Sequence, residues 1–180
     1  METVVEMSKH AKQSDTRVIK TKTISSPVGD LVLYATDDAL IAAQMVNQKH
    51  AIDLDAETVR RPHPILDSAV RDFTAYFSGN RAPVKTPLAA KGTAFQQLVW
   101  AALRTIPFGE TWSYAQLAKK IGKPNAVRAV GTANSRNPIA ILVPCHRVIC
   151  ASGALTGYAG GIDKKEWLLA HEAKQQKLLG

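Results

Sequence analysis

The sequence predicts an α+β protein, with a small antiparallel sheet in its N-terminal half and a helical C-terminal half that contains a helix-turn-helix. Short runs rich in β-branched residues, separated by turn residues, lie before residue 47. Apolar residues then recur at helical spacing, and three capping-box patterns follow residue 92. We therefore expect a disordered lead-in over residues 1–16, an N-terminal α/β domain over 17–90 and a C-terminal domain over 91–180.

The N-terminal half is predicted to hold three strands and one helix. Strands are expected over residues 17–25, 31–35 and 39–46, and turn residues separate them. Residues 47–63 are polar and are expected to form a loop. A helix is expected to begin at Pro64 and to end at Gly79, with its stripe of apolar residues, Tyr76 among them, facing the core.

The C-terminal half is predicted to begin with three helices. A capping box at Thr93 opens the first, and a second box at Ser113 opens a short helix that Gly122 ends. Another helix is expected over residues 125–135. Two short helices joined by a glycine-containing turn indicate a helix-turn-helix.

Two further segments complete the predicted C-terminal half. Residues 139–143 form an apolar run before Pro144 and are expected to be a short buried strand or extended segment. Asp163 and Glu166 have the spacing of a third capping box, which would open a last helix that includes Glu172.

The positive charge of the chain is confined to its second half. The net charge is +8, but residues 1–90 hold 11 basic and 11 acidic residues, whereas residues 91–180 hold 12 basic and 4 acidic ones. A neutral half beside a basic half indicates that the second half contacts a polyanion such as nucleic acid. A basic surface that serves only solubility would give the same counts.

Composition also argues against several classes of protein. Cys145 and Cys150 lie five residues apart, so neither a disulfide framework nor a cysteine zinc site is expected. The chain has no membrane-length apolar run and no secretory signal, so we expect a cytoplasmic protein without membrane contact. It has no nucleotide-binding glycine motif and no cluster of metal ligands, so we expect no cofactor and no metal.

A candidate nucleophile lies in the segment 144–148. A free thiol titrates above neutral pH, so a nucleophilic cysteine needs a base or a nearby positive charge. His146 follows Cys145 directly, and Glu172 on the last predicted helix is the candidate to orient that histidine. The dipeptide alone is a weak signal, because a buried structural cysteine beside a surface histidine would have the same sequence.

The complete motif set is more specific. Residues 137–149 closely resemble the active-site signature of the alkylguanine-DNA alkyltransferases, also called methylated-DNA–protein-cysteine methyltransferases. The resemblance runs from about Thr93 to Glu172, and the N-terminal half matches only in outline, as a small RNase H-like sheet domain. The other matching motifs are Phe108–Glu110, Ser113–Ala118, Ala126–Gly131, Ser152–Ala154, Gly157–Gly161 and Lys165–Glu172.

The resemblance implies a chemical role for five residues. Cys145 resembles the alkyl acceptor, and His146, acting through a water, and Glu172 resemble the relay that activates it. Asn137 resembles the asparagine that braces the turn between the DNA-binding helix and the site. Tyr114 resembles the tyrosine at the phosphate of the flipped nucleotide.

The resemblance also implies DNA contacts and a base pocket. Arg128 resembles the arginine that takes the place of the extruded base in the stack. Ser113 is expected at a helix start that suits a phosphate. Small residues are expected to let a helix backbone approach the minor groove at Ala126, Ala129 and Gly131. Tyr158 resembles an aromatic wall of the base pocket. The backbone groups of Val148, Ala159 and Cys145 resemble those that read the guanine.

The implied function is DNA repair by direct reversal. The protein would flip O6-alkylguanine, and also O4-alkylthymine, out of double-stranded DNA and transfer the alkyl group irreversibly to Cys145. A thioether is a poor leaving group, so each molecule would act once, as a monomer or cooperatively along DNA. Three alternatives stay open: a base-flipping lesion sensor, a cysteine hydrolase, and a plain helix-turn-helix regulator.

Overall fold

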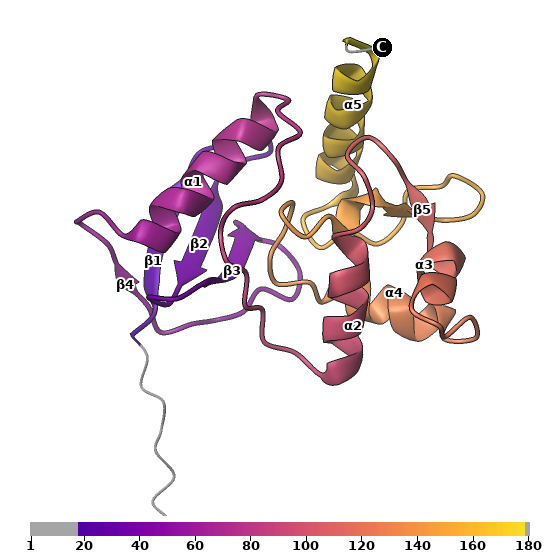
Figure 1. Cartoon of the computed structure of the whole chain (residues 1–180), viewed down its shortest axis with the longest axis horizontal. Helices are drawn as coiled ribbons and strands as arrows, with labels where there is room; N and C mark the ends of the chain where they lie inside the picture. The colour runs from indigo at the N-terminus through magenta and orange to yellow at the C-terminus, as the bar shows by residue number, and fades with distance from the viewer. Residues whose placement is uncertain (1–17, 179–180) are drawn as a thin grey trace, which may run out of the picture.

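The computed structural model describes residues 18–178, in which two halves share one hydrophobic core (Figure 1). The predicted lead-in over residues 1–16 and the first residue of the first predicted strand lie outside the described residues. The α+β class is confirmed: a sheet with one covering helix forms the N-terminal half, and helices dominate the C-terminal half.

The sheet contains the three predicted strands and a fourth that was not predicted. β1 (Lys20–Ile24), β2 (Leu31–Ala35) and β3 (Leu40–Met45) form an antiparallel meander. β4 (Glu57–Thr58) pairs parallel to β1, so the order is β3-β2-β1-β4 and the sheet is mixed. The loop prediction for residues 47–63 is therefore wrong at β4, because two exposed residues show no alternation that a sequence pattern can detect.

One face of this sheet is buried by α1 (Pro64–Phe77), which lies across it in Figure 1. Alternate residues of β2 are fully buried, as period-2 alternation predicts. The helix contributes Leu66, Ala69 and Phe73 to the same core. His63 caps its first turn, and Gly79 follows its end with a φ of 80°, which a glycine adopts without strain.

The helical half contains α2 (Ala94–Leu103), α3 (Tyr114–Lys120), α4 (Val127–Ser135) and α5 (Ile162–Leu178). The capping boxes predicted at the starts of α2 and α3 both form. None of the helices within residues 18–178 has the length and apolar character needed to cross a membrane.

Two predicted helix starts differ from the structure. α4 begins at Val127 rather than at residue 125, because the N–H of Ala126 closes a separate turn with the carbonyl of Lys123. α5 begins at Ile162, so Asp163 lies in its first turn and cannot be the cap. The third capping-box prediction is therefore wrong, although Asp163 still places a negative charge at the positive end of the helix dipole.

The segment 139–143 is buried as predicted, but it folds into a tight turn instead of running extended. Ile141 has a φ of 71°, and the N–H of Val143 donates to the carbonyl of Ile139 at 3.2 Å. Just before this turn, the N–H of Ala140 donates to the carbonyl of Ala43 on β3 at 2.9 Å. The turn is thus anchored on the edge of the N-terminal sheet.

The next residues form a short 3-10 helix η1 (Cys145–Arg147) and then β6 (Val148–Ile149). β6 pairs parallel to β5 (Trp112–Ser113), which leads directly into α3. The candidate nucleophile therefore lies between the anchored turn and the start of α3.

Candidate active site

Cys145 is the first residue of η1, and its side chain is buried. Its N–H donates to the carbonyl of Val143 at 2.8 Å, and its carbonyl accepts from Asn134 Nδ2 at 3.4 Å. Asn134 belongs to α4, so a direct contact joins this helix to the backbone of the candidate nucleophile.

The environment of the Cys145 thiol has two opposing effects on its pKa. Burial raises the pKa, because a thiolate loses its hydration. The side chain of Asn137, the positive charge of Lys165 and nearby backbone N–H groups lower it. Burial prevails, so the resting group is a thiol that already has donors and a positive charge in place for the thiolate.

Asn137 braces the turn that precedes Cys145. Its Nδ2 donates to the carbonyls of Ile139 at 3.2 Å and Val143 at 2.8 Å, and its Oδ1 accepts from the N–H of Ile139 at 3.0 Å. The side chain is buried, so these bonds face little competition from water. One amide therefore connects the end of α4, the turn and the thiol.

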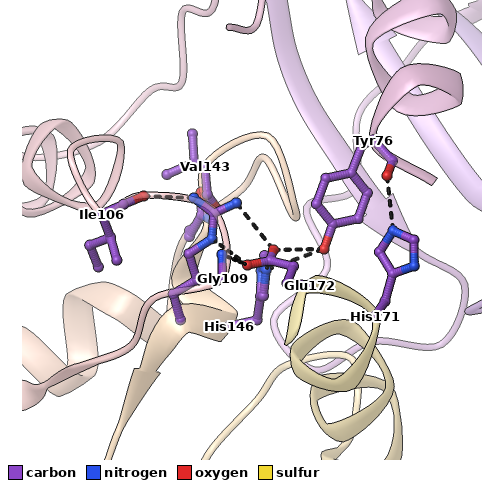
Figure 2. Close-up of polar contacts among 9 residues, drawn as sticks. Tyr76, Ile106, Gly109, Val143, His146, His171 and Glu172 are labelled. Atoms are coloured by element: carbon purple, nitrogen blue, oxygen red, sulfur yellow. Dashed lines mark hydrogen bonds and ion pairs between the residues drawn. The ribbon is translucent and has the colours of Figure 1, made fainter. Parts of the chain in front are cut away.

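His146 and Glu172 form a buried pair (Figure 2), and His146 follows Cys145 directly in the chain. His146 Nε2 lies 2.7 Å from Glu172 Oε1, and both side chains are almost fully excluded from solvent. A carboxylate can only accept, so the proton is assigned to Nε2, which leaves the lone pair of Nδ1 available. Nδ1 is buried and has no hydrogen-bond partner within the described residues.

Burial, together with the positive charges of Arg147 and Lys165, lowers the pKa of His146 more than Glu172 raises it. The resting imidazole is therefore neutral at neutral pH and can accept a proton at Nδ1. This is the state that a general base requires.

Glu172 accepts hydrogen bonds from four different residues. Besides His146, the donors are the Tyr76 hydroxyl at 2.8 Å, the N–H of Gly109 at 2.9 Å, and Arg147, through Nε at 2.9 Å and Nη2 at 3.1 Å. Burial raises the pKa of Glu172, but His146 and Arg147 together outweigh burial and lower the pKa to about 2. The carboxylate therefore stays ionised with all its partners in place.

Sequence reasoning missed Tyr76 and Arg147 as members of this cluster. Tyr76 was predicted on the apolar stripe of α1, and its ring is buried there. Its hydroxyl also donates to Glu172, which links the N-terminal half to this cluster. Arg147 lies within the quoted signature, and its place directly after the candidate histidine was the available signal. The structure shows that its side chain is buried.

Acid is expected to destabilise this cluster. Glu172 has a folded-state pKa of about 2 against an ordinary value of 4.5, so its contribution is present above about pH 4.5 and is lost as the pH falls toward 2. The pKa of His146 is lowered too, so its contribution is present above its ordinary value of 6.5 and is lost as the pH falls through the folded value. Urea unfolding should therefore give a free energy that falls from about pH 7 to about pH 2, first through His146 and below about pH 4.5 through Glu172. A free energy that is flat or rises over this range would contradict the assignment.

Cys145 borders a small cavity of about 10 Å³, in which a purine does not fit. The structure brings Tyr158 and Ala159 to this cavity as the sequence predicted, and it adds Gln48 from the segment after β3. Gln48 was not predicted, because residues 47–63 carried no motif. The N-terminal half thus contributes to the lining of the cavity.

The backbone groups expected to read guanine already have partners. The carbonyl of Val148 accepts from Lys165 Nζ at 2.6 Å, and Val148 does not line the cavity. The carbonyl of Ala159 accepts from the N–H of Lys49 at 2.8 Å. A base that enters must therefore share or displace these contacts.

The predicted DNA-contacting residues lie on α3 and α4, outside the buried cluster. Ser113 caps α3. The ring of Tyr114 lies 3.8 Å from the point that a Cβ atom would occupy if Gly131 on α4 had a side chain. Arg128 and Ala129 are exposed, whereas Ala126 and Gly131 are half-buried. The short side chains project little from this surface of α4, so a nucleic acid backbone could approach the helix closely.

Within residues 18–178, no three His, Cys, Asp or Glu side chains gather in a way that could hold a metal ion. Cys145 and Cys150 are both free thiols.

Comparison with known proteins assigns both halves of the chain. Residues 19–90 match the family model described as 6-O-methylguanine DNA methyltransferase, ribonuclease-like domain, and residues 94–174 match the DNA binding domain of the same family. A methylated-DNA–protein-cysteine methyltransferase of Mycolicibacterium paratuberculosis is 47% identical over 157 residues, which are 87% of this chain and 94% of that protein. One from Methanosarcina acetivorans is 47% identical over 147 residues, or 82% of this chain and 94% of its own.

A solved structure shows the same fold. The crystal structure of Mycobacterium tuberculosis OGT in complex with DNA has a TM-score of 0.80 and 46% identity, and covers 87% of this chain and 94% of that one. The identity and the coverage place this protein among enzymes of one kind. The chain belongs to the methylated-DNA–protein-cysteine methyltransferase family, the 6-O-methylguanine DNA methyltransferases.

Proposed function

We propose that the protein repairs double-stranded DNA by moving alkyl groups from O6 of guanine, and also from O4 of thymine, to Sγ of its own Cys145. Its relatives are named methylated-DNA–protein-cysteine methyltransferases, and the similar M. tuberculosis OGT was crystallised with DNA. The observation that carries the proposal is the buried pair of His146 and Glu172. His146 follows the buried Cys145 directly in the chain, and its Nδ1 has no hydrogen-bond partner within the described residues. The hydrolase and regulator alternatives do not fit this family.

The transfer would proceed in one displacement. The proton of Cys145 passes through a water to His146 Nδ1, and Glu172 stabilises the imidazolium that forms. Sγ then bonds to the alkyl carbon as the bond from that carbon to O6 breaks, and the electron pair stays on the guanine. The guanine takes up the proton that Cys145 lost, so that the products are an alkylated cysteine and an ordinary base.

Access to the thiol requires the base to leave the duplex. Cys145 is buried beside a cavity of about 10 Å³, so a base within a stacked helix cannot present its alkylated oxygen to it. Arg128 is exposed on α4, and its planar guanidinium can occupy the space that the base vacates. We therefore propose that α4 enters the minor groove, that Tyr114 contacts the phosphate of the flipped nucleotide, and that the cavity widens to admit the base.

Arg128→Ala is expected to slow transfer from duplex DNA by roughly 10- to 100-fold, because unstacking a base costs a few kcal/mol that the arginine offsets. Transfer from free O6-methylguanine base should keep its rate, because a free base needs no flipping. Second-order rate constants for both substrates measure this difference. The matched control is Arg136→Ala, which removes the same charge from an exposed position at the end of α4. Equal losses for duplex and free base, or for both variants, would rule out the flipping role.

A further inference from the structure

A second cavity lies behind the candidate active site and has no role in the transfer. It is a cleft of about 530 Å³ between the two halves, and Cys145 does not line it. Its walls come from the end of α1, the segment 80–85, the segment 104–108 and the turn that precedes η1. Tyr76 and Arg147 separate it from Glu172, which both contact (Figure 2 shows Tyr76 beside Glu172).

The walls of this cleft are strongly basic. Its cationic lining residues are Arg71, Arg81, Lys85, Arg104 and Arg147. Its one lining carboxylate, Asp72, already accepts from the N–H groups of Lys85 and Thr86 and from the Thr86 hydroxyl. Neither the ammonium group of Lys85 nor the guanidinium of Arg104 has a carboxylate within 4.0 Å in the described part of the chain. The lining therefore holds five cations and one carboxylate, and Glu172, which pairs with Arg147, is not among the lining residues.

Two of these guanidinium groups converge on one aromatic ring. The Cζ atoms of Arg81 and Arg147 lie 5.6 Å and 5.5 Å from the centre of the Phe108 ring. Both cations therefore lie beside the Phe108 ring, which itself lines the cleft. Arg147 uses three of its five N–H groups on Glu172 and Ile106, so two N–H groups have no partner within residues 18–178.

Apolar residues also line the cleft, namely Val84, Ile106, Pro107, Leu142 and Pro144. Its volume falls within the range of about 300–1,000 Å³ that is typical of small-molecule sites. A ligand that matches both the cationic and the apolar lining carries phosphates and a flat, less polar group.

We propose that this cleft binds a small phosphorylated molecule of nucleotide size, with its phosphates among Arg81, Lys85, Arg104 and Arg147 and its base against the apolar lining residues. The site is separate from the proposed DNA surface on α3 and α4. Through Arg147 it adjoins the carboxylate that holds His146. Its ligand would therefore occupy the rear of the transfer site and not its entrance.

Calorimetric titration of the full-length protein with ADP tests the proposal. We expect saturable binding of one ADP, no binding of adenosine, and an affinity about tenfold weaker in the double variant Lys85→Gln with Arg104→Gln, which removes two charge-assisted contacts. The matched control is Arg60→Gln with Arg61→Gln, which removes the same charge from exposed residues outside the cleft and should leave the affinity unchanged.

Three results would overturn the proposal. ADP that does not saturate shows that the cleft is only a solvated basic surface. Equal weakening in both double variants shows that the overall charge attracts the probe. A single-stranded oligonucleotide that binds more tightly than ADP, with the same dependence on Lys85 and Arg104, assigns the phosphates to a DNA strand instead.

Discussion

Glu172→Gln is expected to lower the free energy of unfolding by about 3–5 kcal/mol, because it leaves the buried Arg147 without its counter-charge. An amide also places an N–H₂ group where the carboxylate now accepts from Tyr76, Gly109, His146 and Arg147, so one donor must face another. The rate of alkyl transfer should fall by at least about 100-fold, as expected when a general base loses the group that orients and stabilises it. Urea unfolding and single-turnover transfer measure the two effects.

The control for this variant is Glu166→Gln, the same chemical change at an exposed position on the same helix. It should leave both stability and rate near their original values. A pH profile distinguishes positioning from simple loss of structure. Glu172 raises the pKa of His146, so its loss should lower that pKa and shift the rise of the transfer rate to lower pH. A slower rate with an unshifted profile in folded protein would mean that Glu172 only supports the fold.

The local features of the fold could be predicted from the sequence. The capping boxes at Thr93 and Ser113 form because each involves residues only three positions apart. The features that depend on distant partners could not. β4 exists only because it pairs with β1, and the turn at Ile141 forms where Ala140 binds the edge of β3 and Asn137 holds the turn.

The candidate site shows the same limit. The signature and the resemblance predicted that Cys145, His146 and Glu172 act together. The structure places His146 Nε2 2.7 Å from Glu172 Oε1. Tyr76 lies 96 positions before Glu172 in the chain, and its helical spacing is the same as that of any core aromatic residue. The basic cleft is equally invisible, because its cations come from segments spread between residues 71 and 147.

Cys145→Ser is expected to abolish alkyl transfer while the protein still binds alkylated DNA. A serine hydroxyl fits the same space but does not ionise near neutral pH, so the His146–Glu172 pair has no thiolate to generate. The matched control is Cys150→Ser, since Cys150 is the other free thiol and its Sγ contacts the Thr156 hydroxyl at 3.1 Å outside the buried cluster. That variant should transfer the alkyl group at the original rate.

Intact mass spectrometry tests the central claim most directly. Each protein would be mixed with excess duplex that carries a single O6-methylguanine, and the modified residue would be mapped by peptide analysis. We predict that the original protein and Cys150→Ser each gain one methyl group on Cys145 and that Cys145→Ser gains none. A protein that binds the lesion tightly but gains no mass, or that gains the methyl group on another residue, would contradict the claim that Cys145 is the alkyl acceptor.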